Sequence, residues 1–91
     1  MSTKRRGKIE IIHDMLRSMQ DKGGTIKPTH LLYKSNLSHS KMKEYVGELM
    51  NNGMMEEVEV KKKRMFSLTD KGSNFLVEYA KIKEFSDSFG L

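Results

Sequence analysis

The segment from Asn36 to Glu57 restricts the fold of this chain more than any other part of the sequence. Its apolar residues recur at i, i+3, i+4, i+7 and i+8, the period of a helix buried along one side, and they are Met42, Tyr45, Val46, Leu49 and Met50. Ser38 can cap the start of such a helix, and Gly53 can take the left-handed conformation just past its end. The pattern predicts a helix of about four turns over residues 38–52.

The other side of this predicted helix is polar and basic, and its residues can reach the edges of bases. The candidates near its first turns are His39, Ser40, Lys41, Lys43 and Glu44. Tyr45 lies on the apolar stripe, where a core position is the more frequent role than a base-stacking platform. Glu44 could instead pair with a neighbouring lysine on the helix surface.

Two further helices are predicted before it. The first spans residues 6–22, with Ile9, Ile12, Leu16 and Met19 along one stripe. A short second helix begins near Pro28 and buries the pair Leu31 and Leu32. A tight turn over residues 35–37 then leads into the helix at residues 38–52. This spacing is typical of a helix-turn-helix, whose second helix enters the major groove of DNA.

A hairpin is predicted after Gly53. Its first strand spans residues 55–60, with Val58 and Val60 on one side and Glu57 and Glu59 on the other, and Met65, Phe66 and Leu68 supply the return strand. Four cations are expected together at the tip between the strands, namely Lys61, Lys62, Lys63 and Arg64. Their mutual repulsion is relieved if a polyanion lies alongside, and a solvated turn is the alternative.

The last predicted helix starts at Thr69, which can serve as N-cap, followed by Asp70. Its apolar residues spread over more than half of its circumference, so one side can cover the core while another needs a partner. A symmetric homodimer is the simplest partner, with contacts expected at Phe75, Tyr79, Ile82 and Phe85. The alternative is that one subunit buries both sides of the helix.

These elements predict a mainly α fold with a two-stranded β-wing (α+β), that is, a winged helix-turn-helix plus a C-terminal dimerisation helix. The expected division assigns residues 1–68 to the winged helix-turn-helix and residues 69–91 to the C-terminal helix of the same domain. A chain of 91 residues is long enough for one modest core, and oligomerisation often stabilises domains of this size.

Charge favours a nucleic-acid partner. The chain has 17 Lys and Arg against 12 Asp and Glu, a net charge of +5, and its pI is near 9.5. The basic residues cluster in two runs, over residues 4–8 and residues 61–64, as expected of a surface that binds phosphates. Lys4, Arg5 and Arg6 are expected to form a mobile arm. Lysines are also common solubilising residues, so charge alone does not decide the matter.

Several other classes are disfavoured. The chain has no cysteine, and its three histidines are far apart, so neither a disulfide framework nor a metal cofactor is expected. No residue set suggests catalysis, and no small-molecule pocket is evident. No apolar run approaches the length of a membrane span. We expect a cytoplasmic, nucleoid-associated protein that is not an enzyme.

Three stretches of the sequence carry a family resemblance. They are RRGKIEIIHDML, LLYKSNLSHSKMKEYVGELMNNGMMEE and FSLTDKGSNFLVEYAKI. Together they resemble the archaeal winged-helix regulator family of small dimeric DNA-binding proteins, over residues 4–85. The resemblance implies DNA binding as a homodimer, with a terminal helix that forms the dimer contact.

Three functional hypotheses follow. The chain could be a sequence-selective transcriptional regulator, a chromatin-like protein that binds DNA with little sequence preference, or a winged-helix module for RNA or protein contacts. Apart from Asn51, the outer side of the helix over residues 38–52 offers few long side chains that can bind a base with two hydrogen bonds. DNA binding is therefore better supported than strong sequence selectivity.

Overall fold

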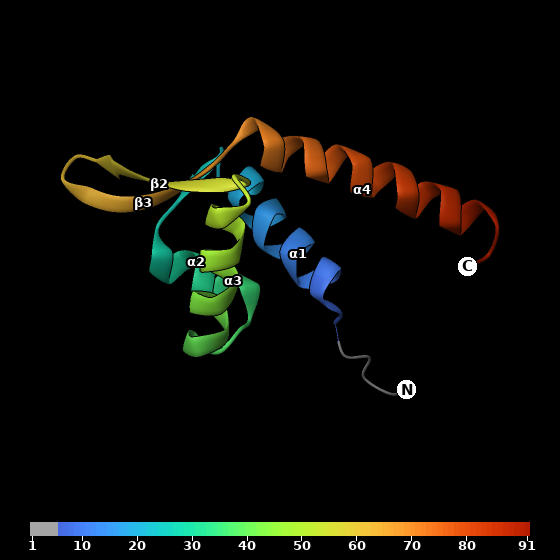
Figure 1. Ribbon diagram of the computed structural model, residues 1–91, viewed down its shortest axis with the longest axis horizontal. Helices are drawn as coiled ribbons and strands as arrows, with labels where there is room; N and C mark the ends of the chain where they lie inside the picture. Colours follow the sequence, from blue (N-terminus) through green and yellow to red (C-terminus); the bar gives the residue numbers. More distant parts are fainter. Residues whose placement is uncertain (1–5) are drawn as a thin grey trace.

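The computed structural model describes residues 6–91, so Lys4 and Arg5 of the expected arm lie outside the described residues. The elements, in chain order, are α1 (Lys8–Asp21), β1 (Thr25–Ile26), α2 (Pro28–Ser35), α3 (His39–Asn51), β2 (Met55–Val60), β3 (Lys63–Leu68) and α4 (Asp70–Ser88). Helices α1 to α3 form the body, the β2–β3 hairpin projects from one end and α4 extends towards the other (Figure 1). The predicted α+β class is confirmed.

The three strands form one antiparallel sheet in the order β1-β3-β2. Strand β1 was not predicted from the sequence. It has only two residues, paired as Thr25 with Ser67 and Ile26 with Phe66, which is too short to show an alternating pattern. The backbone N–H of Leu68 also donates to the Gly24 carbonyl at 2.7 Å, so the Gly-Gly turn after α1 joins the sheet edge.

The core lies where α1, α2 and α3 meet the base of the sheet. Its fully buried large side chains are Met15, Leu16, Met19, Ile26, Leu31, Leu49, Met55 and Phe66. The predicted stripe of α1 was wrong at its first position, because Ile9 is 53% exposed. Met15, which lies beside that stripe, is fully buried instead, so the buried side of α1 is centred on Met15, Leu16 and Met19.

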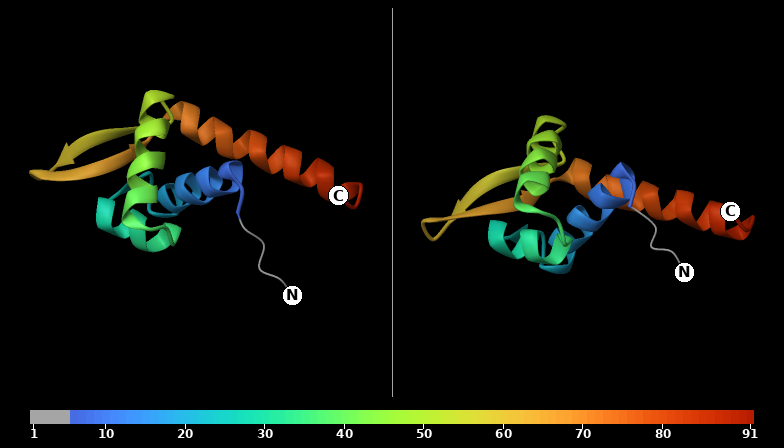
Figure 2. Two further views of the ribbon diagram at one scale, coloured as in Figure 1. Left: turned by 60° about the horizontal axis from the view of Figure 1, so that its bottom comes forward. Right: turned by 90° about the horizontal axis from the view of Figure 1, so that it is seen from below.

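The expected helix-turn-helix is present in the described chain. Helix α2 ends at Ser35, and Asn36 takes the left-handed conformation with φ of 55°. Ser38 then caps α3, since its hydroxyl accepts the backbone N–H of Lys41 at 3.2 Å. The two further views in Figure 2 show α3 crossing over α2, with its outer side away from the body.

Contacts from the segment LTDKG, residues 68–72, hold the start of α4 against the end of α3. The Thr69 hydroxyl accepts the backbone N–H of Gly72 at 3.1 Å and donates to the Gly53 carbonyl at 2.7 Å. The Lys71 ammonium donates to the Asn52 carbonyl at 2.7 Å, beside the last turn of α3. Gly72 is buried where any Cβ would overlap the Met54 carbonyl oxygen. This joint fixes the direction of α4 relative to α3.

Helix α4 contacts α1 through its first half and extends past the body with its second half (Figure 1). Leu76 is buried, whereas Ile82 is 67% exposed and Phe85 is 65% exposed. One subunit therefore does not bury both sides of α4, as the alternative to a dimer would require. Among residues 6–91, no helix is both long and apolar enough to cross a membrane.

Candidate nucleic-acid interface

Helix α3 presents its polar residues on the outer surface of the body. Met42, Val46 and Leu49 are buried and fix the rotation of the helix. The five residues expected to read DNA are all exposed, and they are His39, Ser40, Lys41, Lys43 and Glu44. Tyr45 is partly buried against the core, as expected for a stripe position. The surface of α3 is therefore open to a ligand along its first two turns.

Two carboxylates of α3 are already engaged by lysines. Glu44 pairs with Lys41 at 3.6 Å, three residues earlier on the same helix. Glu48 pairs with Lys8 of α1, and the hydrogen bond from the ammonium to that carboxylate raises the pKa of Lys8. Both pairs are solvent-exposed, so each contributes little to stability.

The prediction that all four hairpin cations lie at the tip was wrong. The turn consists of Lys61 and Lys62 alone, because Lys63 pairs with Val60 and Arg64 pairs with Glu59 across the strands. The prediction placed four residues in the turn because strand register cannot be derived from charge. Lys61 and Lys62 therefore extend furthest from the body, and Lys63 and Arg64 lie along strand β3.

The two tip lysines have a backbone conformation that L-residues seldom adopt. Their φ angles are 52° and 65°. A two-residue hairpin loop with positive φ at both positions is the type I′ pattern, which favours Asn-Gly. Each lysine loses roughly 1 kcal/mol or more relative to a residue that tolerates this region. A charged pair at the tip is thus kept at a cost in stability.

Arg64 is held on one face of the hairpin by two contacts. Its Nε lies 3.0 Å from Glu57 Oε2 in an ion pair, and its guanidinium carbon lies 5.2 Å from the centre of the Phe66 ring. Phe66 is itself fully buried. The arginine therefore lies along one face of the hairpin, with 58% of its side chain exposed.

Helix α3 and the hairpin share one groove. Its lining comes from α3, from β3 and from the start of α2, and consists of Pro28, His39, Met42, Lys43, Val46, Arg64 and Phe66. The floor is apolar, and the rim is formed by His39, Lys43 and Arg64. Two of the predicted site elements thus meet on one side of the molecule.

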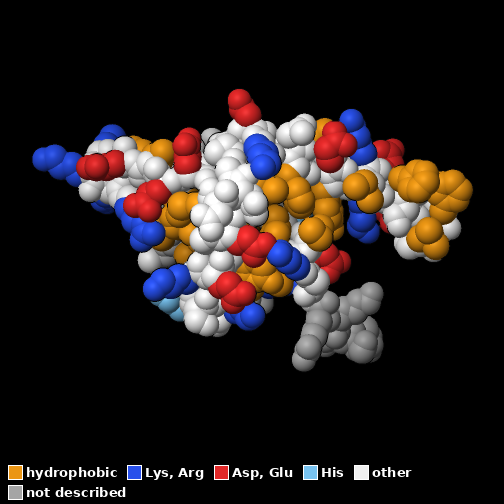
Figure 3. Space-filling model, viewed as in Figure 1, with side chains coloured by type: hydrophobic (Ala, Val, Ile, Leu, Met, Phe, Trp, Pro, Cys, Tyr) orange, Lys and Arg blue, Asp and Glu red, His pale blue; other side chains and the backbone are white. Residues whose placement is uncertain are grey.

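Among the described residues 6–91, four cations of this region have no carboxylate within ion-pair distance: Lys43, Lys61, Lys62 and Lys63. Figure 3 shows Lys and Arg side chains at the hairpin tip and below it, and hydrophobic side chains at the far end of α4. The hairpin tip is therefore cationic, whereas the far end of α4 carries a group of exposed apolar side chains.

Arg6 is positioned differently from the mobile arm that was expected. Its guanidinium pairs with Asp14 of α1 at 2.7 Å and donates to the Ser35 carbonyl at 3.0 Å. These contacts tie the start of α1 to the end of α2. The sequence does not predict this ion pair, because Arg6 and Asp14 are eight residues apart and helical pairs are three or four residues apart.

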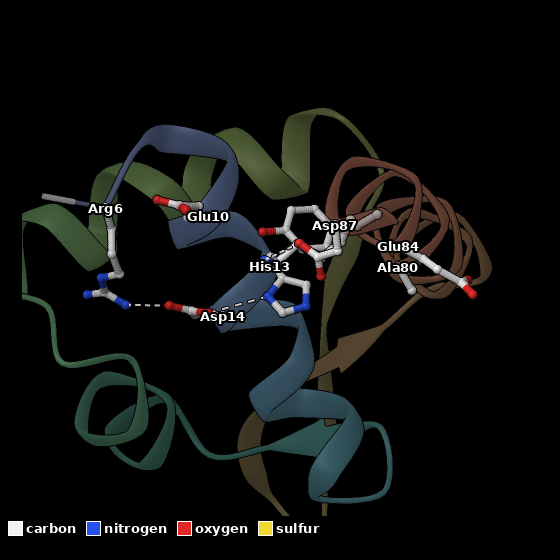
Figure 4. A pocket seen from close by; sticks show the side chains of 9 residues that line it. Arg6, Glu10, His13, Asp14, Ala80, Glu84 and Asp87 are labelled. Carbon is white, nitrogen blue, oxygen red and sulfur yellow. Dashed lines mark hydrogen bonds and ion pairs between the residues drawn. The ribbon is translucent and has the colours of Figure 1, made fainter. Parts of the chain in front are cut away.

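A second cavity lies between α1 and α4, with a volume of about 640 Å³, and it was not anticipated from the sequence. Figure 4 shows its walls: Asp14 links Arg6 to His13, and Glu84 and Asp87 approach from α4. His13 stacks on Tyr79 with ring centroids 4.1 Å apart. The lining has more acidic than basic groups, the wrong sign for a phosphate surface. Tyr79, an expected dimer contact, is thus engaged within its own chain.

A cluster of lysines surrounds His30 on α2. Burial lowers the pKa of this imidazole, and the charges of Lys22, Lys34 and Lys27 lower it further. Lys27 is the extended N-cap residue of α2, and Lys34 lies in the last turn of the same helix. Sequence reasoning missed this cluster because its residues come from two elements and form no run.

The family model described as "Winged helix-turn-helix" matches residues 5–87. No curated protein matches the chain.

Solved structures share the fold. Sso10a-2, a DNA-binding protein from Sulfolobus solfataricus, is similar with a TM-score of 0.74 and 23% identity, over 93% of this chain and 90% of that one. A winged-helix DNA-binding protein from STIV has a TM-score of 0.73 and 15% identity, over 88% and 92%. A MarR family transcriptional regulator from Silicibacter pomeroyi has a TM-score of 0.75 and 23% identity, over 91% of this chain but 58% of that protein.

Proposed function

The chain belongs to the winged helix-turn-helix family, and from this premise we propose that it is a homodimeric, non-enzymatic protein that binds double-stranded DNA, as a transcriptional regulator in the cytoplasm. In this proposal, residues 1–68 contact DNA and residues 69–91 join the two subunits. The similar structures are described as DNA-binding proteins and regulators, and this supports the same class of partner for this chain.

The observation that carries the proposal is the shared groove of α3 and the hairpin. Lys43 of α3 and Arg64 of β3 lie on the same rim, so one duplex can contact both. Helix α3 would enter the major groove with His39, Ser40 and Lys41 near its N-terminal half.

Two further residues of α3 suit this placement. Glu44 could accept a hydrogen bond from a cytosine amino group once it leaves Lys41. Gly47 lies on the open surface of the helix, where even an added Cβ would meet no atom within 4 Å. The absence of a side chain there leaves space for the close approach of a duplex.

The hairpin and the N-terminal segment would bind the backbone. Lys61, Lys62 and Lys63 are free to meet phosphates beside the groove occupied by α3. Lys4 and Arg5 would add further phosphate contacts. Such contacts determine affinity and its dependence on salt, and they carry no sequence information.

The far end of α4 would provide the dimer contact. Phe75 lies seven residues before Ile82 but is partly buried against the core of its own subunit, and Ile82, Phe85 and Phe89 follow at i, i+3 and i+7. This is the spacing of a short coiled-coil seam. The rings of Phe85 and Phe89 lie 5.0 Å apart, forming one exposed apolar patch. Tyr79 borders this patch and stays stacked on His13.

The test is a binding titration with random and selected duplexes at several salt concentrations. If about six cations meet phosphates, log affinity should fall with log salt at a slope near −5, using about 0.9 per phosphate. The variant Lys61→Gln with Lys62→Gln should make the slope shallower by about two. The control Lys81→Gln with Lys83→Gln removes the same charge from α4 and should leave the slope unchanged. Equal slopes for both double variants would contradict the proposed surface.

The chromatin-like function is the second candidate, and one observation favours it. Glu44 is paired with Lys41, and α3 carries no arginine to bind a base with two hydrogen bonds. A ratio of selected to random affinity below about ten would indicate this function, since regulators usually exceed about a thousand.

A further inference from the structure

We propose that Arg64 acts with α3 as a reader of base edges in the major groove, and that Glu57 is the residue that positions it. The inference rests on the proposed function, because it needs a duplex against α3. It gives Arg64 a different role from its neighbours Lys61 to Lys63, which would bind phosphates.

Strand register places the relevant side chains on one face of the hairpin. Glu57 is opposite Phe66, and Glu59 is opposite Arg64. Directly opposed residues of an antiparallel pair share a face, as do residues two apart on one strand. These four residues therefore lie together on the face that lines the groove with α3, where both Phe66 and Arg64 are found.

The contacts of Arg64 use part of its guanidinium and leave the rest available. Nε is the atom that pairs with the Glu57 carboxylate, and the guanidinium carbon lies over the Phe66 ring. The two terminal nitrogens can still donate side by side, which is the arrangement that matches O6 and N7 of guanine. A side chain already held in one orientation loses less conformational entropy on binding than a free one.

The acidic neighbours favour a base edge over a phosphate. Glu57 and Glu59 lie on the same face as Arg64, so a phosphate placed at the guanidinium would also approach two carboxylates. Like charges repel at such distances, whereas a base edge has acceptor atoms but no net charge. The surroundings of Arg64 thus select the uncharged partner, in contrast to the hairpin tip.

This role supplies what α3 lacks. Helix α3 offers Lys43 and His39 to the groove, but no arginine. Arg64 reaches the same groove from β3, with a side chain suited to two parallel hydrogen bonds. Arg64 would therefore add the DNA-sequence selectivity that the residues of α3 do not provide.

The first test compares Arg64→Lys with wild-type protein on a duplex selected by the wild type and on random duplexes. Lysine keeps the charge but loses the paired donors. We expect affinity for the selected duplex to fall about 5- to 150-fold, the equivalent of about 1–3 kcal/mol for a bidentate base contact. Random affinity and the salt slope should stay unchanged. Equal losses on both kinds of duplex, or no loss on either, would overturn the inference.

The second test replaces the contacted guanine with 7-deazaguanine, which lacks the N7 acceptor. Wild-type affinity should fall at one position of the selected site, and Arg64→Lys should show no further loss there. Losses that add independently at every guanine would refute the contact.

The third test isolates Glu57. Glu57→Gln should lower the ratio of selected to random affinity, because Arg64 becomes free to bind phosphates. The matched control is Glu56→Gln, which removes the same charge from the opposite face of β2, where Glu56 is paired with Ser67. It should shift both affinities equally. Equal behaviour of the two variants would overturn the positioning role. Circular dichroism and urea denaturation confirm that each variant folds.

The results separate the inference from the function on which it rests. If the wild type binds no duplex, both fail. If it binds all duplexes equally, the reading role of Arg64 fails while DNA binding stands.

Discussion

Gly72 shows how a single residue decides the joint between α3 and α4. A Cβ there would overlap the Met54 carbonyl oxygen and the Leu68 side chain. Backbone cannot move aside as a flexible side chain can. The glycine in LTDKG is thus explained by close approach of α4 to the turn after α3, and not by the conformational freedom of a turn.

Gly72→Ala is therefore expected to destabilise the protein by about 1–3 kcal/mol, the usual range for overpacking. The measurement is urea denaturation followed by circular dichroism. The control is Gly47→Ala on the outer surface of α3, where a Cβ meets nothing within 4 Å. It should stabilise the helix by up to about 1 kcal/mol, because alanine has the higher helix propensity. A neutral Gly72→Ala variant would contradict the close approach.

His30 is expected to couple the stability of the fold to pH. Its pKa is lowered by burial and by Lys22, Lys34 and Lys27. The folded state thus binds this proton more weakly than the unfolded chain, in which the pKa is near 6.5. Above that value both states are neutral and the group contributes nothing. As pH falls through 6.5, the folded state loses stability relative to the unfolded one.

NMR titration of the His30 imidazole should therefore give a pKa below 6.5, and Lys34→Gln should raise it. The control Lys81→Gln, on α4, should leave it unchanged. If phosphates bind beside these lysines, the pKa of His30 should also rise in the DNA complex. A pKa at or above 6.5 in the free protein would rule out this account of the cluster.

At the scale of elements, the hairpin turn combines charge with an unfavourable conformation. Replacing its two residues by the preferred pair, Lys61→Asn with Lys62→Gly, should stabilise the protein by about 1 kcal/mol or more. Affinity for DNA should fall and become less dependent on salt, because two phosphate contacts are lost. Urea denaturation and salt titration measure the two effects. Lower stability, or an unchanged salt slope, would contradict this description of the turn.

The elements themselves were largely predictable because their signals are local. Ser38 and Thr69 mark the starts of α3 and α4 by capping, and the alternation over residues 57–60 indicates β2. Strand β1 was missed because two residues cannot show a period. The extent of the turn, the pairing of Arg64 with Glu57 and the attachment of Arg6 to Asp14 all depend on register or on contacts between elements. No spacing within one element encodes those contacts.

At the scale of the whole molecule, cationic and apolar surfaces lie at opposite ends. The described residues extend over 48 × 28 × 22 Å, with the hairpin at one end and the second half of α4 at the other (Figure 1). A partner subunit on α4 would therefore leave the α3 and hairpin surfaces of both subunits open to the proposed DNA partner. The family resemblance predicted a dimer, but its geometry depends on the direction in which α4 leaves the body.

Disrupting the apolar end should separate the subunits. Ile82→Glu with Phe85→Lys keeps the net charge and places a favourable pair three residues apart on the helix. Sedimentation equilibrium should show a monomer, and DNA affinity should fall because one subunit contacts only half of a symmetric site. The control Val77→Glu changes an apolar residue outside the seam spacing and should remain dimeric. A dimer that survives the double substitution would contradict the α4 contact.

In the proposed dimer, the length of α4 determines how far the body of each subunit lies from the dimer contact. Nineteen residues at about 1.5 Å each span about 28 Å. One residue inserted between Gly72 and Ile82 would rotate the body of each subunit by about 100° around the axis of α4. Seven inserted residues would restore nearly the same orientation, with the body about 10 Å further from the dimer contact. The spacing between the two half-sites of a bound DNA operator could then change only in steps of about seven residues, or two turns, of α4.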